Sequence, residues 1–209
     1  MGSRMMHLII PNETAKKCPI KNKNLFLLGG LAPDAVTTDK EASHFYRGKH
    51  KEYTRRIAYE EFYDKYSDHP QQDYILGYYC HLIADDLWLT GFFSPWLKNR
   101  IETHEEILKK YHYDFYLLNG KLAEYYGVNT SVVRNLNVPT ELSNLVEVKK
   151  DELNDFLPFL LDDFNYNKAE TKQPLNVFTF DQIVGYIETA VEKSLYYLNN
   201  KTSIYKNLV

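Results

Sequence analysis

Two residues of types that bind metals lie four positions apart in an apolar stretch. His81 and Asp85 belong to the run GYYCHLIADDLW at residues 77–88. On an α-helix, residues i and i+4 lie on one face roughly 6 Å apart, so this imidazole and this carboxylate can reach one divalent ion. A charge among residues that prefer burial is costly unless it is paired or bound to a metal. The spacing therefore predicts that His81 and Asp85 share a metal ion.

A third candidate ligand, Asp114, is expected on the apolar face of a later helix. It falls on the same stripe as Tyr111, so its carboxylate should face the core and needs a partner or a metal. His112 lies about 200° around that helix from Asp114, and His104 about 15 Å away along the axis. Neither histidine is therefore expected to share a site with Asp114.

Other candidates are ambiguous when each is taken alone. Asp34 follows a proline at the end of a Gly-rich apolar run, where it is either a turn aspartate that accepts backbone N–H groups or a functional carboxylate. His7 opens an apolar stretch as a core histidine or a ligand, and His44 also has apolar neighbours. His50 lies in a charged run and His69 in a polar turn, and both are expected to be solvated.

Taken together and in order, these residues resemble the bacterial zinc-dependent phospholipase C family, in particular its small intracellular Firmicute branch. The resemblance spans about residues 6–120. It rests on Gly-x-x-Pro-Asp ending at Asp34, Ser-His-Phe around His44, and Gly-Tyr-x-x-His-Leu-x-x-Asp-x-x-Trp over residues 77–88. It implies an all-α bundle of the phospholipase C and single-strand nuclease type, with zinc between helices. It also implies a set of metal ligands: His7, Asp34, His44, His81, Asp85 and Asp114.

The chemistry of these side chains leads to a functional hypothesis. Six ligands suit one or two ions, and nitrogen and carboxylate donors favour Zn²⁺, with Mn²⁺ or Fe as alternatives. A metal-bound hydroxide can attack a phosphoester, and Asp34 is expected both to bind metal and to orient or deprotonate the water. We therefore expect hydrolysis of a small phosphoester, with a lipid-derived or nucleotide substrate left open. The alternative is a non-catalytic helical binding domain whose structural metal has a closed shell of protein ligands.

The elements that must position these residues are expected to be helices, because 3.6-residue periodicity recurs and alternating strand patterns are scarce. A capping-box spacing at residues 38–41 predicts another helix start, Ala32-Pro33-Asp34 predicts a turn, and Gly120 predicts a helix end. A polar stretch at 165–178 is expected to be a loop. The helices are predicted at residues 6–17, 51–66, 72–90, 96–119, 121–127, 140–164 and 181–199.

Length and composition suit one domain. The chain has 209 residues, of which 44% are hydrophobic and 25% charged, as in ordinary soluble proteins. We expect a single all-α domain over residues 6–209, with the motifs in 6–120 and a helical C-terminal part in 121–209. Residues 1–5 are expected to be a tag remnant or a disordered start.

Several classes of protein are disfavoured by the same sequence. A net charge of −3 gives no reason to expect binding of long nucleic acids. No stretch is apolar for 18 residues, so no transmembrane segment is expected. The N-terminus lacks a signal-peptide pattern, and two cysteines imply no disulfide framework. We therefore expect a cytoplasmic protein whose partner is a small phosphoester.

Overall fold

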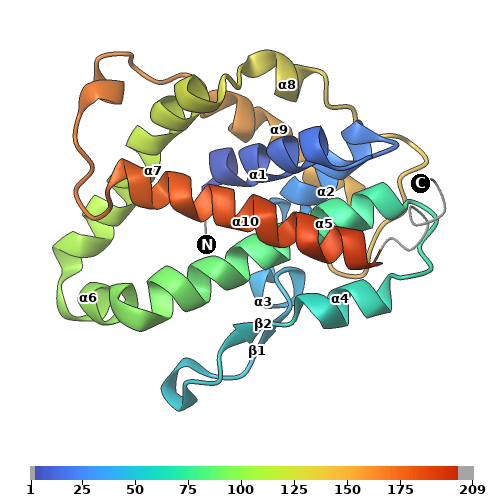
Figure 1. Ribbon diagram of the computed structural model, residues 1–209, viewed down its shortest axis with the longest axis horizontal. Helices are drawn as coiled ribbons and strands as arrows, with labels where there is room; N and C mark the ends of the chain where they lie inside the picture. Colours follow the sequence, from blue (N-terminus) through green and yellow to red (C-terminus); the bar gives the residue numbers. More distant parts are fainter. Residues whose placement is uncertain (1–2, 202–209) are drawn as a thin grey trace.

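The computed structural model describes residues 3–201, and its fold is an all-α multi-helix bundle with one very short β-hairpin (Figure 1). The expected fold class is confirmed. Three short elements of other helical types, η1 (His50–Glu52), η2 (Leu89–Leu97) and η3 (Glu170–Lys172), lie between the α-helices. The α-helices are α1 (Arg4–Lys17), α2 (Lys23–Ala35), α3 (Lys40–Ser43), α4 (Tyr59–Lys65), α5 (Gln72–Trp88), α6 (Lys98–Thr103), α7 (Glu105–Tyr126), α8 (Thr130–Arg134), α9 (Lys150–Asp162) and α10 (Phe180–Lys201).

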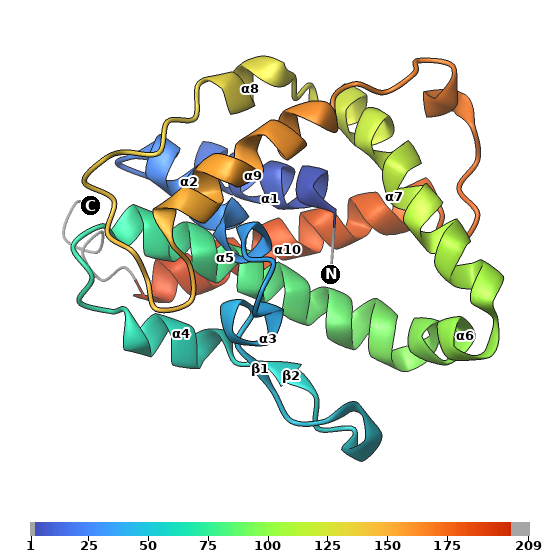
Figure 2. The same ribbon diagram turned by 180° about the vertical axis from the view of Figure 1, so that it is seen from behind.

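Helix α5 is the centre of the bundle. Every residue from Tyr74 to Asp85 is buried, because α2 and α10 pack along α5 and α1 packs against all three. Figure 2 shows that α9 crosses α2 and α1 on the side that faces away from α10. A helix enclosed on all sides is apolar all round, which explains why the predicted helix at 72–90 has so few polar residues.

Glycines allow α2 to approach its two neighbours closely. A Cβ atom at Gly77 of α5 would lie 1.9 Å from the carbonyl oxygen of Phe26 in α2, and one at Gly29 would lie 2.0 Å from the carbonyl oxygen of Tyr74. On the other side of α2, a Cβ at Gly30 would lie 2.6 Å from Cγ of Pro11 in α1. The Gly-rich run is therefore a helix–helix contact. Helix α2 continues through the turn predicted at residues 32–34 and ends at Ala35.

Helix α1 begins before residue 6. Ser3 is its N-cap, and the Ser3 side chain accepts a hydrogen bond from the backbone N–H of Met6. Met5 is fully buried, and Arg4 pairs with Asp163 at 2.7 Å. Residues 3–5 are thus ordered parts of the fold, whereas residues 1 and 2 lie outside the described residues.

The helix predicted over residues 51–66 is wrong in its first half. Strands β1 (Tyr46–Arg47) and β2 (Arg56–Ile57) pair antiparallel with Tyr46 opposite Ile57, and the hairpin projects from the helical body (Figures 1 and 2). Gly48 and Tyr53 have φ angles of 72° and 56°. Such left-handed residues turn the chain and cannot continue an α-helix.

The segment after α5 remains helical where a break was predicted. Residues Leu89–Leu97 form a π-helix that contains Pro95 and leads into α6. Gly120 likewise lies inside α7, which runs on to Tyr126. A Cβ at Gly120 would lie 2.6 Å from the ring of Tyr166, so this glycine makes room for a loop and does not end the helix.

The C-terminal part has less helix than predicted in the segment that precedes α9. The segment that follows α9 agrees with the prediction. The helix predicted at 140–164 is confined to Lys150–Asp162, and residues 165–179 are mainly loop. Helix α10 starts at Phe180, one residue before the predicted start at residue 181. The backbone N–H of Thr179 donates to the side chain of Gln182 at 2.9 Å, and the backbone N–H of Gln182 donates to the side chain of Thr179 at 3.2 Å. Within residues 3–201, every helix is too short or too polar to cross a lipid bilayer.

Candidate metal centre

Asp85 of α5 lies at the centre of a buried cluster of histidines. Its oxygens are 3.3 Å from Nε2 of His7, 3.5 Å from Nε2 of His44 and 3.6 Å from Nε2 of His81. His81 is one helical turn before Asp85, as the spacing predicted, while His7 comes from α1 and His44 directly follows α3. All these side chains are at least 97% buried.

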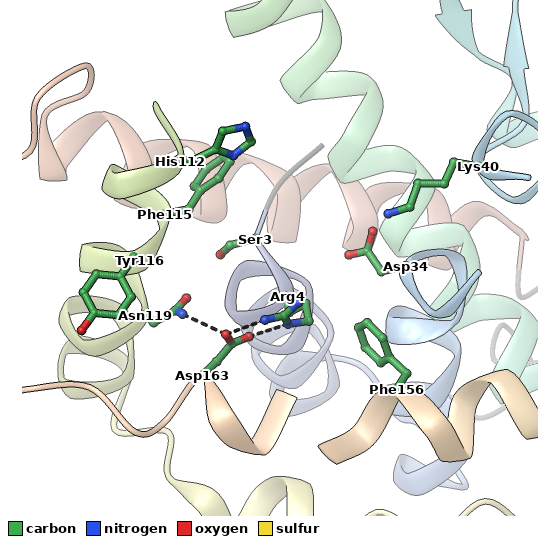
Figure 3. Close-up of a pocket in the computed structure, with 10 residues that line it drawn as sticks. All are labelled: Ser3, Arg4, Asp34, Lys40, His112, Phe115, Tyr116, Asn119, Phe156 and Asp163. Carbon is green, nitrogen blue, oxygen red and sulfur yellow. Dashed lines mark hydrogen bonds and ion pairs between the residues drawn. The ribbon is translucent and has the colours of Figure 1, made fainter. Parts of the chain in front are cut away.

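Asp34, at the end of α2, lies at the edge of this cluster. Its Oδ1 is 3.5 Å from Nε2 of His44, and its side chain is 11% exposed where that of Asp85 is fully buried. Asp34 also lines a cavity of about 420 Å³, shown in Figure 3. It is therefore the carboxylate of the cluster that a molecule in the cavity can contact.

Backbone carbonyls fix the ring orientation of two histidines. Nδ1 of His81 lies 2.9 Å from the carbonyl oxygen of Gly30, and Nδ1 of His44 lies 3.1 Å from that of Lys40. Because a carbonyl only accepts hydrogen bonds, each Nδ1 carries the proton and each Nε2 presents a lone pair to the cluster. This arrangement is typical of histidines that ligate metals through Nε2.

The backbone around His44 is held in an unusual shape. Phe45 has a φ of 51°, a left-handed value that is uncommon for a bulky residue. Its ring packs at 5.2 Å from that of Phe62, and the hydroxyl of Tyr78 donates to the carbonyl oxygen of Ser43. These contacts maintain the strained turn that aims His44 at Asp85.

The cluster contains buried nitrogen atoms without hydrogen bonds. Among the described residues, both ring nitrogens of His7 and Nε2 of His81 lack a hydrogen-bond partner. Nε2 of His7 nevertheless lies 3.3 Å from Asp85. Their rings stack with centroids 3.8 Å apart. An unsatisfied buried polar atom costs about 1–3 kcal/mol, so a ligand bound among these nitrogens would relieve part of that cost.

The protonation states suit a cation. Burial lowers the pKa of His7 to about 4, so its imidazole is neutral near pH 7. Burial raises the pKa of Asp34, but the contact with His44 and the nearby His7 and His81 outweigh this effect and hold the pKa below its ordinary range. His7 therefore offers a neutral imidazole near the ionised carboxylate of Asp34, which is the state that binds metals.

The distances also fit metal ligation. Two ligands at tetrahedral angles, each with a bond of about 2.0–2.1 Å to one ion, are separated by roughly 3.3–3.4 Å. The nitrogen–oxygen separations of 3.3–3.6 Å around Asp85 are close to this value. Two overlapping groups have ligand atoms within 4.8 Å of one another and could hold an ion: His7, Asp34 and His81, and His44, His81 and Asp85.

Asp114 is buried as predicted, but it lies outside both groups. Its carboxylate accepts hydrogen bonds from the backbone N–H groups of Asn176, Val177 and Phe178 at 2.7, 2.7 and 3.2 Å, and from Nδ2 of Asn176 at 2.9 Å. These bonds fix the segment that leads into α10. The core-facing carboxylate thus has protein donors as its partners.

The remaining histidines also lie outside the cluster. His50, His104 and His112 are partly or fully exposed, and His69 accepts a hydrogen bond from the backbone N–H of Gln71. His112 nevertheless lines the cavity beside Asp34. Lys40, for which the sequence predicts only a place near a helix start, lines the same cavity. The only signal in the sequence is its nearness to His44.

Comparison with family models, with curated proteins and with solved structures finds no match to this chain.

Proposed function

We propose that this protein is a metal-dependent hydrolase of small phosphoesters, with chemistry like that of the bacterial zinc-dependent phospholipases C. The observation that carries the proposal is the position of the buried cluster. Nε2 lone pairs converge around Asp85, and Asp34 connects this cluster to a cavity of about 420 Å³. A purely structural metal site has no need of such a cavity.

The metal would be held by five side chains of the cluster: His7, Asp34, His44, His81 and Asp85. Imidazole and carboxylate donors favour Zn²⁺, with Mn²⁺ or Fe as alternatives, and five side chains suit one or two ions. A bound divalent ion would supply a nucleophilic hydroxide near neutral pH and offset negative charge on the phosphoryl group.

The role of Asp34 follows from its exposure. The other cluster carboxylate, Asp85, is enclosed by imidazoles, whereas Asp34 lines the cavity. Asp34 is therefore positioned to orient the attacking water and to accept its proton. Because the pKa of Asp34 lies below its ordinary range, the carboxylate is ionised at neutral pH and can accept a hydrogen bond from the attacking water.

The test is hydrolysis of a chromogenic phosphodiester and a chromogenic phosphomonoester by protein loaded with Zn²⁺ or Mn²⁺. We expect turnover above the metal-only blank. Asp34→Asn should keep most of the metal and lose roughly 10²–10⁴-fold in turnover, because an amide cannot accept the proton. Stoichiometric metal without turnover on either substrate would instead support a non-catalytic helical domain with a structural metal.

A further inference from the structure

The cavity beside Asp34 has two cationic side chains of different kinds. Arg4 is ion-paired, since its Nε and Nη2 donate to the two oxygens of Asp163, each at 2.7 Å. Asp163 also accepts a hydrogen bond from Nδ2 of Asn119 at 3.1 Å. This bidentate pair neutralises the Arg4 charge and fixes one wall of the cavity, as Figure 3 shows.

Lys40 is the other cation of the cavity. Its ammonium group points toward Asp34 in Figure 3, yet no residue in 3–201 lies within 4.0 Å of it as an ion-pair partner. Lys40 is exposed, so the cavity has, beside the candidate proton acceptor, a positive charge without an ion-pair partner among the described residues.

The backbone of Lys40 ties this charge to the cluster. Its carbonyl oxygen accepts the hydrogen bond from Nδ1 of His44 at 3.1 Å. The short helix that contains it is capped by Asp39, whose side chain accepts from the backbone N–H of Ala42 at 3.0 Å. The residue that orients one candidate ligand therefore also holds an ammonium group at the mouth of the same site.

We propose that Lys40 binds a non-bridging oxygen of the substrate's phosphoryl group while that group lies beside Asp34. This inference rests on the proposed function. An ammonium on a flexible stem is a compact charge that suits phosphate oxygens. Once a cation occupies the cluster, the negative charge of Asp34 is offset by that cation, and an anionic ligand becomes the partner that remains for Lys40.

The experiment compares Lys40→Met and Lys40→Arg with Lys23→Met. Lys23 is a matched control, because it is also an exposed lysine that directly follows an N-cap residue, but at the far end of α2 from Asp34. Each protein is loaded with Zn²⁺, freed of excess metal and checked for metal content. Binding of inorganic phosphate is then measured by calorimetry, and hydrolysis of both chromogenic substrates by steady-state kinetics.

We expect Lys40→Met to weaken phosphate binding and to lower kcat/KM by about 10- to 100-fold, the effect of losing one charged hydrogen bond. The loss should be larger for the dianionic monoester than for the monoanionic diester. Lys40→Arg should stay within roughly threefold of wild type, since the charge is kept, and Lys23→Met should be unchanged.

Failures of the two proposals are distinguishable. If wild type hydrolyses the substrates and Lys40→Met matches it in kcat/KM and phosphate affinity, the Lys40 inference is wrong and the proposed function stands. Loss of metal from Lys40→Met would also overturn the inference, because the effect would then arise in the cluster. If metal-loaded wild type hydrolyses neither substrate, the proposed function itself fails, whatever its affinity for phosphate.

Discussion

At the scale of single residues, Asp85 and Asp114 are both fully buried carboxylates on helices, but they have different partners. The oxygens of Asp114 accept hydrogen bonds of 2.7–3.2 Å from residues 176–178. Around Asp85, three imidazole nitrogens lie at 3.3–3.6 Å, near the spacing of two ligands on one ion. Asp114 therefore serves the fold, and Asp85 is the candidate metal ligand.

Asp85→Asn and Asp114→Asn test this assignment. We expect Asp85→Asn to lose at least about 10-fold in zinc affinity, because an amide is a poor ligand. Asp114→Asn should keep its zinc but lose about 2–4 kcal/mol of unfolding free energy, since its NH₂ group would face buried donors. Elemental analysis of folded protein and denaturant titration measure the two effects. Zinc loss from folded Asp114→Asn would contradict the assignment.

Residue spacing predicted the His81–Asp85 pair and the burial of Asp114, since both follow from helical periodicity. It did not predict what satisfies Asp114, because the donors come from a loop 62–64 positions later. The position of His44 depends equally on a turn with a left-handed Phe45, which local sequence patterns do not predict. That the motif resemblance extends to a shared activity is still a prediction.

At the scale of elements, the crossing of α2 and α5 positions much of the site. His81 lies one turn after Gly77, and Nδ1 of His81 bonds to the carbonyl oxygen of Gly30 at 2.9 Å. Asp34 lies one turn after Gly30 on the same helix. Any change that separates the two helices therefore moves His81 relative to Asp34.

Gly77→Ala is expected to disrupt this crossing, because the new Cβ would lie 1.9 Å from a backbone oxygen. We expect a loss of more than about 3 kcal/mol of stability, and of zinc binding in any protein that folds. Gly185→Ala is the matched control. It lies inside α10 with no atom within 4 Å of the new Cβ, and it should be neutral or add about 0.5–1 kcal/mol. Equal melting temperatures for the two variants would refute the role of the crossing.

Elements with strong periodicity were predicted well, and those shaped by distant contacts were not. Helices α5 and α10 match their predicted ranges closely, because α5 is a long apolar run and α10 buries a regular apolar stripe. The hairpin at 46–57 was missed because its pairing depends on positive-φ turn residues. The prediction that Gly120 ends a helix was wrong. A glycine is needed there because the helix packs against Tyr166, a residue far along the chain.

At the scale of the whole molecule, a metal in the core should stabilise the fold. Binding to the native state alone adds about 2.7 kcal/mol when the free ion is at 100 times its Kd. For a domain of this size we expect Zn²⁺ to raise the Tm of metal-free protein by roughly 5–10 °C, measured by a thermal melt. The shift should vanish in His81→Ala and persist in His104→Ala, an exposed histidine. An equal shift in both variants would show that the ion binds elsewhere.

The cavity is lined by residues from two parts of the chain. All five cluster residues precede residue 90. Part of the cavity wall comes from later in the chain: α7 contributes Phe115, Tyr116 and Asn119, α9 contributes Phe156, and Asp163 directly follows α9. The candidate ligands thus come from the first 90 residues, whereas the cavity wall combines Arg4 and Lys40 of that part with residues of α7 and α9. Substitutions on the α7 and α9 side of the wall therefore reshape the cavity and leave the cluster intact, so proteins with the same cluster can accept different molecules.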